Sequence, residues 1–105
     1  IPMPDMKQMM RQAQKMQAQI AAVQDEIKDM TAEATAGGGM VRAVAGGDMS
    51  IRELVIDPAA VDPEDVDMLQ DMVLAACNEA LRAVTAKGEA RMSMVAGGMH
   101  IPGLM

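Results

Sequence analysis

Few residues in this sequence have side chains that could carry out catalysis. The chain contains one histidine, His100, and one cysteine, Cys77. A Cys–His or Ser–His pair needs both groups held by rigid elements, and His100 lies in a stretch rich in Gly and Pro. Cys77 lies on the apolar stripe of a predicted helix, where a small buried thiol is the simpler interpretation. We therefore expect a protein that is not an enzyme, uses no cofactor and has no small-molecule substrate.

Two groups of residues have side chains that could bind a metal ion. The acidic group lacks the alternating ligands and the Gly of a calcium loop, and helix capping with a solvated face explains it better. Its members are Asp62, Glu64, Asp65, Asp67 and Asp71. The second group consists of thioethers near the two ends, with His100, which could bind Cu(I): Met3, Met6, Met9, Met10, Met92, Met94 and Met99. Because Met6, Met9 and Met16 also recur at helical spacing, we favour packing for this group and expect no metal.

Charge is distributed unevenly along the chain. The net charge is −6, yet residues 1–24 sum to +2, residues 80–105 to +2, and residues 25–79 to −10. The basic residues of the two ends are Lys7, Arg11, Lys15, Arg82, Lys87 and Arg91. The first three are spaced by four and share one helix face. If the two long predicted helices pack antiparallel, the basic residues of both ends form a tip on an acidic body. The alternative is that these residues only form a solvated charged face.

Composition narrows the classes of protein further. The 105 residues fit one domain, and they include 14 Met but no Phe, Tyr or Trp. Without aromatic side chains, RNA recognition by stacking platforms is excluded. The single Cys excludes an intrachain disulfide, and no run of 18 apolar residues or signal peptide is present. We expect a soluble cytoplasmic protein with no membrane partner.

The first 30 residues predict a long helix. Apolar or small residues recur at alternating spacings of three and four, which is typical of a narrow coiled-coil seam: Met6, Met9, Ala13, Met16, Ile20, Val23, Ile27 and Met30. Such a helix is about 37 Å long, against a width of about 33 Å for a compact domain of this size. We expect it to project beyond the body.

The middle of the chain predicts three strands and a second helix. Strands are expected at 31–36, 40–45 and 49–56, separated by the glycine turn 37–39 and by 46–48. The glycines lack the following Lys and Ser or Thr of a phosphate-binding loop. The strand 49–56 is apolar on both faces and needs cover on both. A helix is expected from Asp62, as N-cap, to a stop at Gly88, which gives one domain, 1–88, and a flexible tail, 89–105.

Several short motifs, in this order, resemble the YbaB/EbfC family of bacterial nucleoid-associated proteins. They are residues 9–17, Gly37-Gly38-Gly39-Met40-Val41, Ile56-Asp57-Pro58, residues 68–73, Asn78-Glu79-Ala80, Gly97-Gly98-Met99 and Pro102-Gly103. The resemblance implies an α+β subunit of order α-β-β-β-α, with long helices on a small antiparallel sheet. It also implies a tweezer-shaped homodimer whose projecting helices bind duplex DNA in the nucleoid.

Carried over to this sequence, the helix tips that bind DNA fall on Lys7, Arg11 and Lys15, with Arg82, Lys87 and Arg91 nearby. The expected contacts are mainly to phosphates, because no element carries a cluster of base-reading side chains. The expected role is chromosome organisation or gene regulation. The alternatives are a Met-rich interaction module or holdase that does not bind DNA, and a Met-based copper protein.

Overall fold

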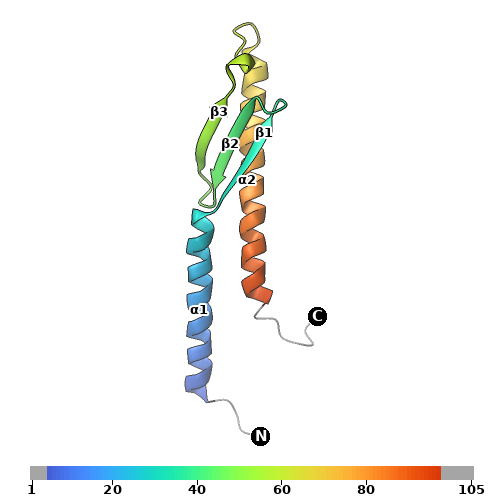
Figure 1. Cartoon of the computed structure of the whole chain (residues 1–105). Coiled ribbons are helices and arrows are strands. Elements are labelled where there is room, and N and C mark those ends of the chain that lie inside the picture. Colours follow the sequence, from blue (N-terminus) through green and yellow to red (C-terminus); the bar gives the residue numbers. More distant parts are fainter. Residues whose placement is uncertain (1–4, 98–105) are drawn as a thin grey trace.

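The computed structural model describes residues 5–97 of the chain (Figure 1). The elements in order are α1 (Met6–Asp29), β1 (Thr31–Ala36), β2 (Val41–Gly46), β3 (Ile51–Ile56), the short 3-10 helix η1 (Pro58–Ala60) and α2 (Val66–Gly97). The three strands form an antiparallel sheet with β2 in the centre. The α+β class and the α-β-β-β-α order predicted from the sequence are confirmed.

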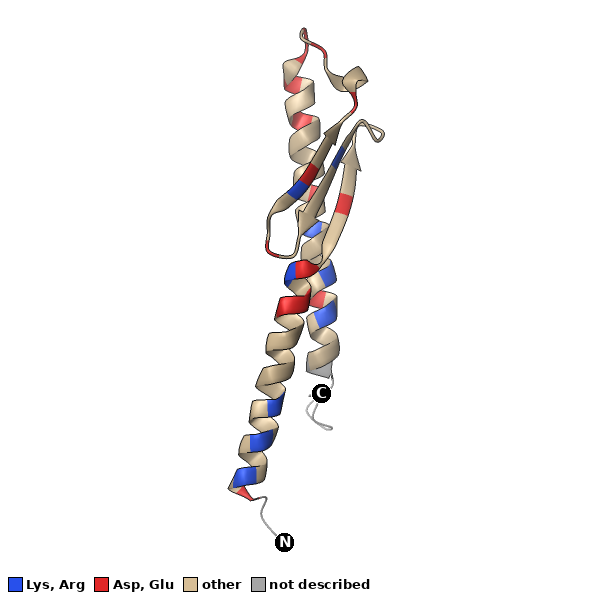
Figure 2. Cartoon of the chain, turned by 60° about the vertical axis from the view of Figure 1, so that its left-hand side comes forward, with Lys and Arg blue, Asp and Glu red and all other residues tan. Residues whose placement is uncertain are grey.

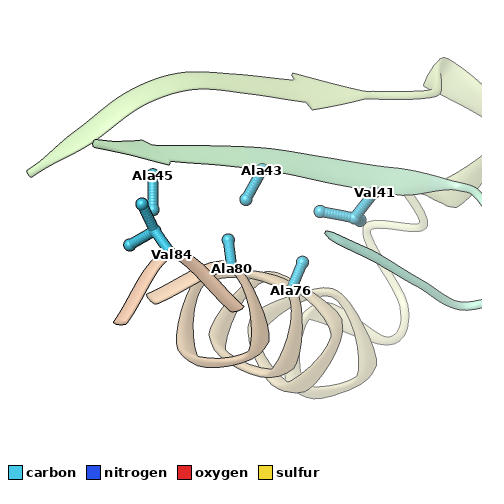
Figure 3. Packing of buried hydrophobic residues seen from close by; sticks show 6 residues of the cluster. All are labelled: Val41, Ala43, Ala45, Ala76, Ala80 and Val84. Atoms are coloured by element: carbon cyan, nitrogen blue, oxygen red, sulfur yellow. The ribbon is translucent and has the colours of Figure 1, made fainter. Parts of the chain in front are cut away.

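The core lies between α2 and one face of the sheet (Figure 3). Alternate residues of β2 point at α2, as the period of two in a strand requires. The buried side chains are Val41, Ala43 and Ala45 of β2 and Ala76, Ala80 and Val84 of α2. Four of these six are alanines, so the helix can approach the sheet closely. This thin core explains how a chain without aromatic residues packs.

Strand β3 forms one edge of the sheet. Five of its six residues are exposed, and Ile51, Leu54 and Val55 each leave at least 40% of their surface open. Leu54 of β3 is paired with Ala43 of β2, so its side chain lies on the same face of the sheet that α2 covers at β2. Strand β3 lies beyond that cover, so the apolar surface predicted for both of its faces is uncovered in the single chain.

The turn between β1 and β2 consists of the three glycines followed by Met40. Gly37, Gly38 and Gly39 have φ of 63°, 70° and 94°. Side chains with a Cβ rarely adopt this left-handed region, so glycine is required. The turn joins β1 to β2 as the sequence predicts.

Both predicted ends of the second helix are wrong. The helix begins at Val66, because residues 62–65 form a separate turn in which the Asp65 N–H donates to the Asp62 carbonyl. The Asp65 carboxylate accepts from the Met68 N–H, the N-cap hydrogen bond that the sequence assigned to Asp62. At the other end α2 runs through Gly88 to Gly97. Residues 89–97 are therefore helical rather than part of a tail, and residues 98–105 lie outside the described part.

The molecule is elongated. It extends 77 × 26 × 16 Å with a radius of gyration of 21.1 Å, against about 13 Å expected for a compact chain of this length. Helices α1 and α2 run antiparallel, and the start of α1 and the end of α2 point toward the same end of the molecule (Figure 1). The predicted projection of α1 is confirmed. None of the helices in residues 5–97 combines the length and the apolar character needed to cross a membrane.

Candidate nucleic-acid interface

The N-terminal half of α1, residues 6–19, extends beyond the rest of the fold, and we call it the arm. All of its residues are exposed. Asp5 caps the helix by accepting from the Lys7 N–H, which satisfies one of the donors left open at a helix start. Lys7, Arg11 and Lys15 follow at intervals of four, about 6 Å apart along the axis. In Figure 2 basic positions recur along the arm, and Asp5 is the single acidic residue among positions 5–19.

The three basic side chains point away from the apolar seam of α1. Within residues 5–97, none of these side chains makes an ion pair or a side-chain hydrogen bond. On the seam, Val23 is only 5% exposed and packs toward α2, while Met16, Met9 and Met6 are 36%, 55% and 76% exposed in turn. The arm therefore presents charge on one side and bare apolar surface on the other.

The end of α1 that joins the sheet is held by contacts from β3 and from the turn between β2 and β3. Only Met30 separates α1 from β1. The Arg52 guanidinium donates to the Lys28 carbonyl at 2.9 Å, so it satisfies an acceptor at the end of the helix. The Gly47 N–H donates to the Met30 carbonyl at 2.9 Å. These hydrogen bonds fix the direction in which α1 leaves the sheet.

Helix α2 supports the same end of α1 from the side. A Cβ on Gly88 would lie 3.0 Å from a methyl carbon of Ile27, which is tighter than ordinary packing. Gly88 is therefore a point of close contact between α1 and α2 rather than the helix stop that the sequence predicted. The residues that follow, Glu89, Ala90 and Arg91, are good helix formers, so α2 continues.

The other three basic residues from the sequence prediction are engaged by protein groups. Arg91 binds Glu26 of α1 through two contacts of 3.1 and 3.2 Å. Lys87 donates to the Thr31 carbonyl at 3.0 Å. Arg82 pairs with Glu79 on its own helix at 2.8 Å. The six basic residues therefore form two groups. The three on the arm have no such partners among residues 5–97. The other three bind neighbouring elements or neutralise a carboxylate.

Acidic residues concentrate at the opposite end of the molecule (Figure 2). Asp57, Asp62 and Asp65 each accept a backbone N–H from the residue two or three positions on, so they cap turns and helix starts. Within residues 5–97, no three His, Cys, Asp or Glu residues gather as a metal site would require. The capping interpretation of this acidic group is therefore confirmed for two of its members, Asp62 and Asp65.

The face of the sheet opposite α2 carries a small ionic network. Arg42 of β2 lies between Glu33 of β1, at 2.8 Å, and Glu53 of β3, at 3.3 Å. The hydrogen bond that Arg42 donates to Glu33 and the negative charges of Glu33 and Glu53 raise the pKa of Arg42. In the turn before β3, the hydroxyl of Ser50 and the guanidinium of Arg52 lower the pKa of Asp48. Both groups are solvent-accessible, so these contacts order the sheet surface more than they stabilise it.

The cysteine takes a packing position, but the described methionines of the copper interpretation are mostly exposed in the single chain, with 55–76% of the surface open at Met6, Met9, Met10 and Met94. Cys77 is half-buried beside the core. Met6 and Met9 lie on the seam of α1, and Met94 lies near the end of α2 with 71% of its surface exposed. Met3, Met99 and His100, which the copper interpretation needs, lie outside the described residues.

Sequence reasoning missed the residues that position the arm. Glu26 and Arg91 are 65 positions apart, and Arg52 and Lys28 are 24 apart, so no local pattern links them. The only available signal was that Arg52 interrupts the apolar strand, and that signal does not name its partner.

Comparison with known proteins gives a consistent assignment. The family model of the YbaB/EbfC DNA-binding family matches residues 3–99. A nucleoid-associated protein from Acetivibrio thermocellus is 52% identical over 97 residues, covering 91% of this chain and 86% of that protein. One from Pelotomaculum thermopropionicum is 48% identical over 100 residues, covering 95% of both.

A solved structure supports the fold independently. The crystal structure of the uncharacterized protein HP0035 from Helicobacter pylori matches with a TM-score of 0.69, covering 93% of this chain and all of that one. Its sequence identity is 23%, so it bears on the fold alone. From the length of the family match and the identity of the relatives, this chain belongs to the YbaB/EbfC DNA-binding family.

Proposed function

We propose that this protein is a nucleoid-associated protein of the cytoplasm that binds duplex DNA as a homodimer and organises the chromosome or regulates genes. Family membership and the names of the relatives support DNA and the nucleoid as its setting. The observation that carries the proposal is the separation of charge along a 77 Å molecule. A basic arm lies at one end, and the acidic residues of the body lie in the middle of the molecule and at its other end (Figure 2).

The arm contacts phosphates in this proposal. Lys7, Arg11 and Lys15 cover about 12 Å of helix, a length over which duplex DNA presents several phosphates. Lysine contacts a phosphate as a point charge and arginine can contact it through two N–H groups. The other side chains of the arm are mostly Gln and Met, with two Ala, and in this proposal binding depends mainly on charge and distinguishes poorly between sequences.

The acidic body determines how DNA approaches. Residues 25–79 carry a net charge of −10, which repels the duplex at distances below the screening length of about 8–10 Å. Residues 1–24, which include the arm, sum to +2, so in this proposal the duplex meets the tips. Arg82, Lys87 and Arg91 contribute less than the arm in this proposal, because their charges are already shared with protein groups.

A homodimer supplies the second arm and covers the exposed edge. Ile51 and Leu54 of β3 are 40% and 42% exposed, and Leu74 of α2 is 60% exposed. An exposed apolar strand edge promotes pairing with another chain. A second copy, related by a two-fold axis, would bury the same surface on both chains.

One observation favours a second candidate function. Met6, Met9, Met10 and Met16 are all exposed on the arm, and flexible methionine surfaces suit promiscuous binding of apolar peptides. A protein-interaction module or holdase of this kind would be indifferent to DNA.

A gel-shift titration separates the two functions. Duplex DNA of about 30 base pairs, an unfolded model protein and an amphipathic peptide are titrated in parallel at 50 mM salt. The DNA proposal expects a shifted duplex and no gain in peptide binding. Binding of peptide or unfolded chain with no shift of DNA would refute it and support the alternative.

A further inference from the structure

The apolar seam of α1 has the pattern of a coiled coil, but it is covered over only part of its length. Val23 is 5% exposed and packs toward α2, whereas Met16, Met9 and Met6 become progressively more exposed toward the tip. The alternating spacing of three and four residues continues unchanged over this stretch. A seam with this spacing is a surface that fits a second helix.

The cover of the seam ends close to where the arm begins. Helices α1 and α2 meet at Ile27 and Gly88, and α2 ends at Gly97. Because both helices rise by about 1.5 Å per residue in opposite directions, Gly97 lies level with about Ala18. Within residues 5–97, no helix of the same chain therefore lies beside residues 6–16 of the seam.

We propose that the seam of the arm binds the same seam of a second copy of this chain, with the two arms antiparallel. The register that fits the spacing places Met6 opposite Met16 and Met9 opposite Ala13, and the same pairs recur in the other direction. Each of the four seam residues then faces a seam residue of the other arm, over about 15 Å of helix. The small side chain of Ala13 leaves room for the flexible side chain of Met9.

The residues that flank the seam allow two identical arms to meet. In a coiled coil the two positions beside the seam usually carry charges that select the partner. Within residues 6–19 these positions are occupied by Met10, Gln12, Gln17 and Gln19. None of them is charged, so no repulsion between like charges at the seam opposes the pairing.

The other charges of the chain favour the antiparallel orientation. Lys7, Arg11 and Lys15 lie on the side of α1 away from the seam. In a pair the two basic faces therefore point outward, about 20 Å apart, which is beyond the screening length of about 8–10 Å. Residues 25–79 carry a net charge of −10. Antiparallel arms place two such acidic bodies at opposite ends, whereas parallel arms would place them side by side.

A cleft at the end of the covered seam receives the tip of the other arm. This cleft has a volume of about 550 Å³, and its apolar lining includes Met16 and Val23 of α1 and Met94 and Val95 of α2. In the proposed register, Met6 of the second copy lies opposite Met16, at the mouth of this cleft. The second copy thus supplies a side chain that the cleft lacks in the single chain.

The contact between two arms is small. From the exposed fractions of the seam residues, a pair buries about 700 Å² in total, below the range of about 1,200–2,000 Å² for stable complexes. Pairing is therefore weak in free solution and increases where arms are concentrated. On DNA it would link neighbouring dimers; this consequence rests on the proposed function, while the pairing itself does not.

Disulfide trapping without DNA tests the register. In a Cys77→Ala background, chains with Met9→Cys are mixed with chains with Ala13→Cys, and the matched control mixes Met9→Cys with Gln14→Cys. Gln14 is one residue from Ala13 but about 100° around the helix. We expect the first mixed disulfide to form at least tenfold faster under mild oxidation, as measured by mass spectrometry of crosslinked peptides. Equal rates for the two mixtures, or a faster disulfide between two Met9→Cys chains, would overturn the proposal.

Sedimentation equilibrium, again without DNA, provides a second measurement. Met9→Gln with Met16→Gln removes apolar contacts of the seam, and the control is Met49→Gln with Met68→Gln, at exposed methionines away from the arm. We expect the average mass of the parent and of the control to rise at least 1.5-fold between about 10 µM and 1 mM chain, the range of weak contacts. The mass of the first variant should stay constant. No rise in the parent, or an equal rise in the first variant, would also overturn the proposal, and a failure of DNA binding would affect neither measurement.

Discussion

The three basic side chains of the arm allow a direct test of how DNA is bound. Replacing Lys7, Arg11 and Lys15 together by Ala removes the positive charge of the arm and keeps strong helix formers at all three positions. None of these side chains makes an ion pair or a side-chain hydrogen bond within residues 5–97. The variant is therefore expected to fold and dimerise like the parent and to lose affinity for every duplex alike.

The size of the effect follows from the number of contacts. Each phosphate contact contributes about 0.9 to the slope of log affinity against log salt. Three contacts on one arm give about 2.7, and two arms of a dimer give about 5.4. Between 50 and 200 mM salt the parent should then lose affinity about 40-fold with one arm engaged, or about 2000-fold with two. The triple variant should lose most of that salt dependence.

Fluorescence anisotropy of a labelled duplex at four or five salt concentrations measures both slopes. Arg11→Gln and Gln70→Glu form a matched pair, because each changes the net charge by one unit, the first on the arm and the second near the start of α2, at the opposite end. Only Arg11→Gln should reduce the slope, by about 1.8 for a dimer. If the triple variant, still a folded dimer by circular dichroism and sedimentation, keeps the parent's affinity and slope, then DNA contacts another surface and the proposed role of the arm is wrong.

Three further substitutions test the dimer, the thiol and the helix contact. Leu54→Asp should split the dimer in sedimentation or unfold the chain, at a cost of several kcal/mol, because a charge would be buried without a partner; Thr35→Asp, on the exposed face of β1, should do neither. A parent that sediments as a monomer at micromolar concentration would contradict this. Cys77→Ala should change DNA affinity by less than threefold, about 0.6 kcal/mol, and a larger loss with intact circular dichroism would give the thiol a role that we do not assign. Gly88→Val should lower the free energy of unfolding in urea by about 1–3 kcal/mol, because its side chain meets Ile27; unchanged stability would mean that the helices separate freely there.

The elements that depend on a local sequence pattern were predictable from the sequence. The alternating spacing of apolar residues predicts α1 to within one residue of its observed end, and the three glycines locate the turn between β1 and β2. Each depends on neighbours in sequence: side chains on one helix face, or backbone angles that only glycine adopts readily. The charge pattern likewise located the basic arm, because α1 is a single helix.

Features that depend on contacts between distant segments were not predictable in this way. A glycine late in a helix signals a stop or a close contact equally well, and only the packing of Gly88 on Ile27 decides between them. The sequence predicted Asp62 as the N-cap, but the separate turn at residues 62–65 leaves Asp65 to cap α2. The partner of Arg91 could not be read from the sequence, so its charge was counted as available although Glu26 binds it.

The single-residue connection at Met30 has a mechanical consequence. Helix α1 is about 36 Å long and is anchored at its base, so a small rotation there is amplified toward the tip. A rotation of about 5° moves the far end by about 3 Å, similar to the rise of about 3.4 Å between successive phosphates of one DNA strand. Loss of the hydrogen bond from Arg52 to the Lys28 carbonyl would thus change the register between basic side chains and phosphates without altering any residue that contacts DNA. The distance spanned by two such helices in a dimer would be set more than 30 Å away from the duplex, by the contacts that hold the end of α1 at the sheet.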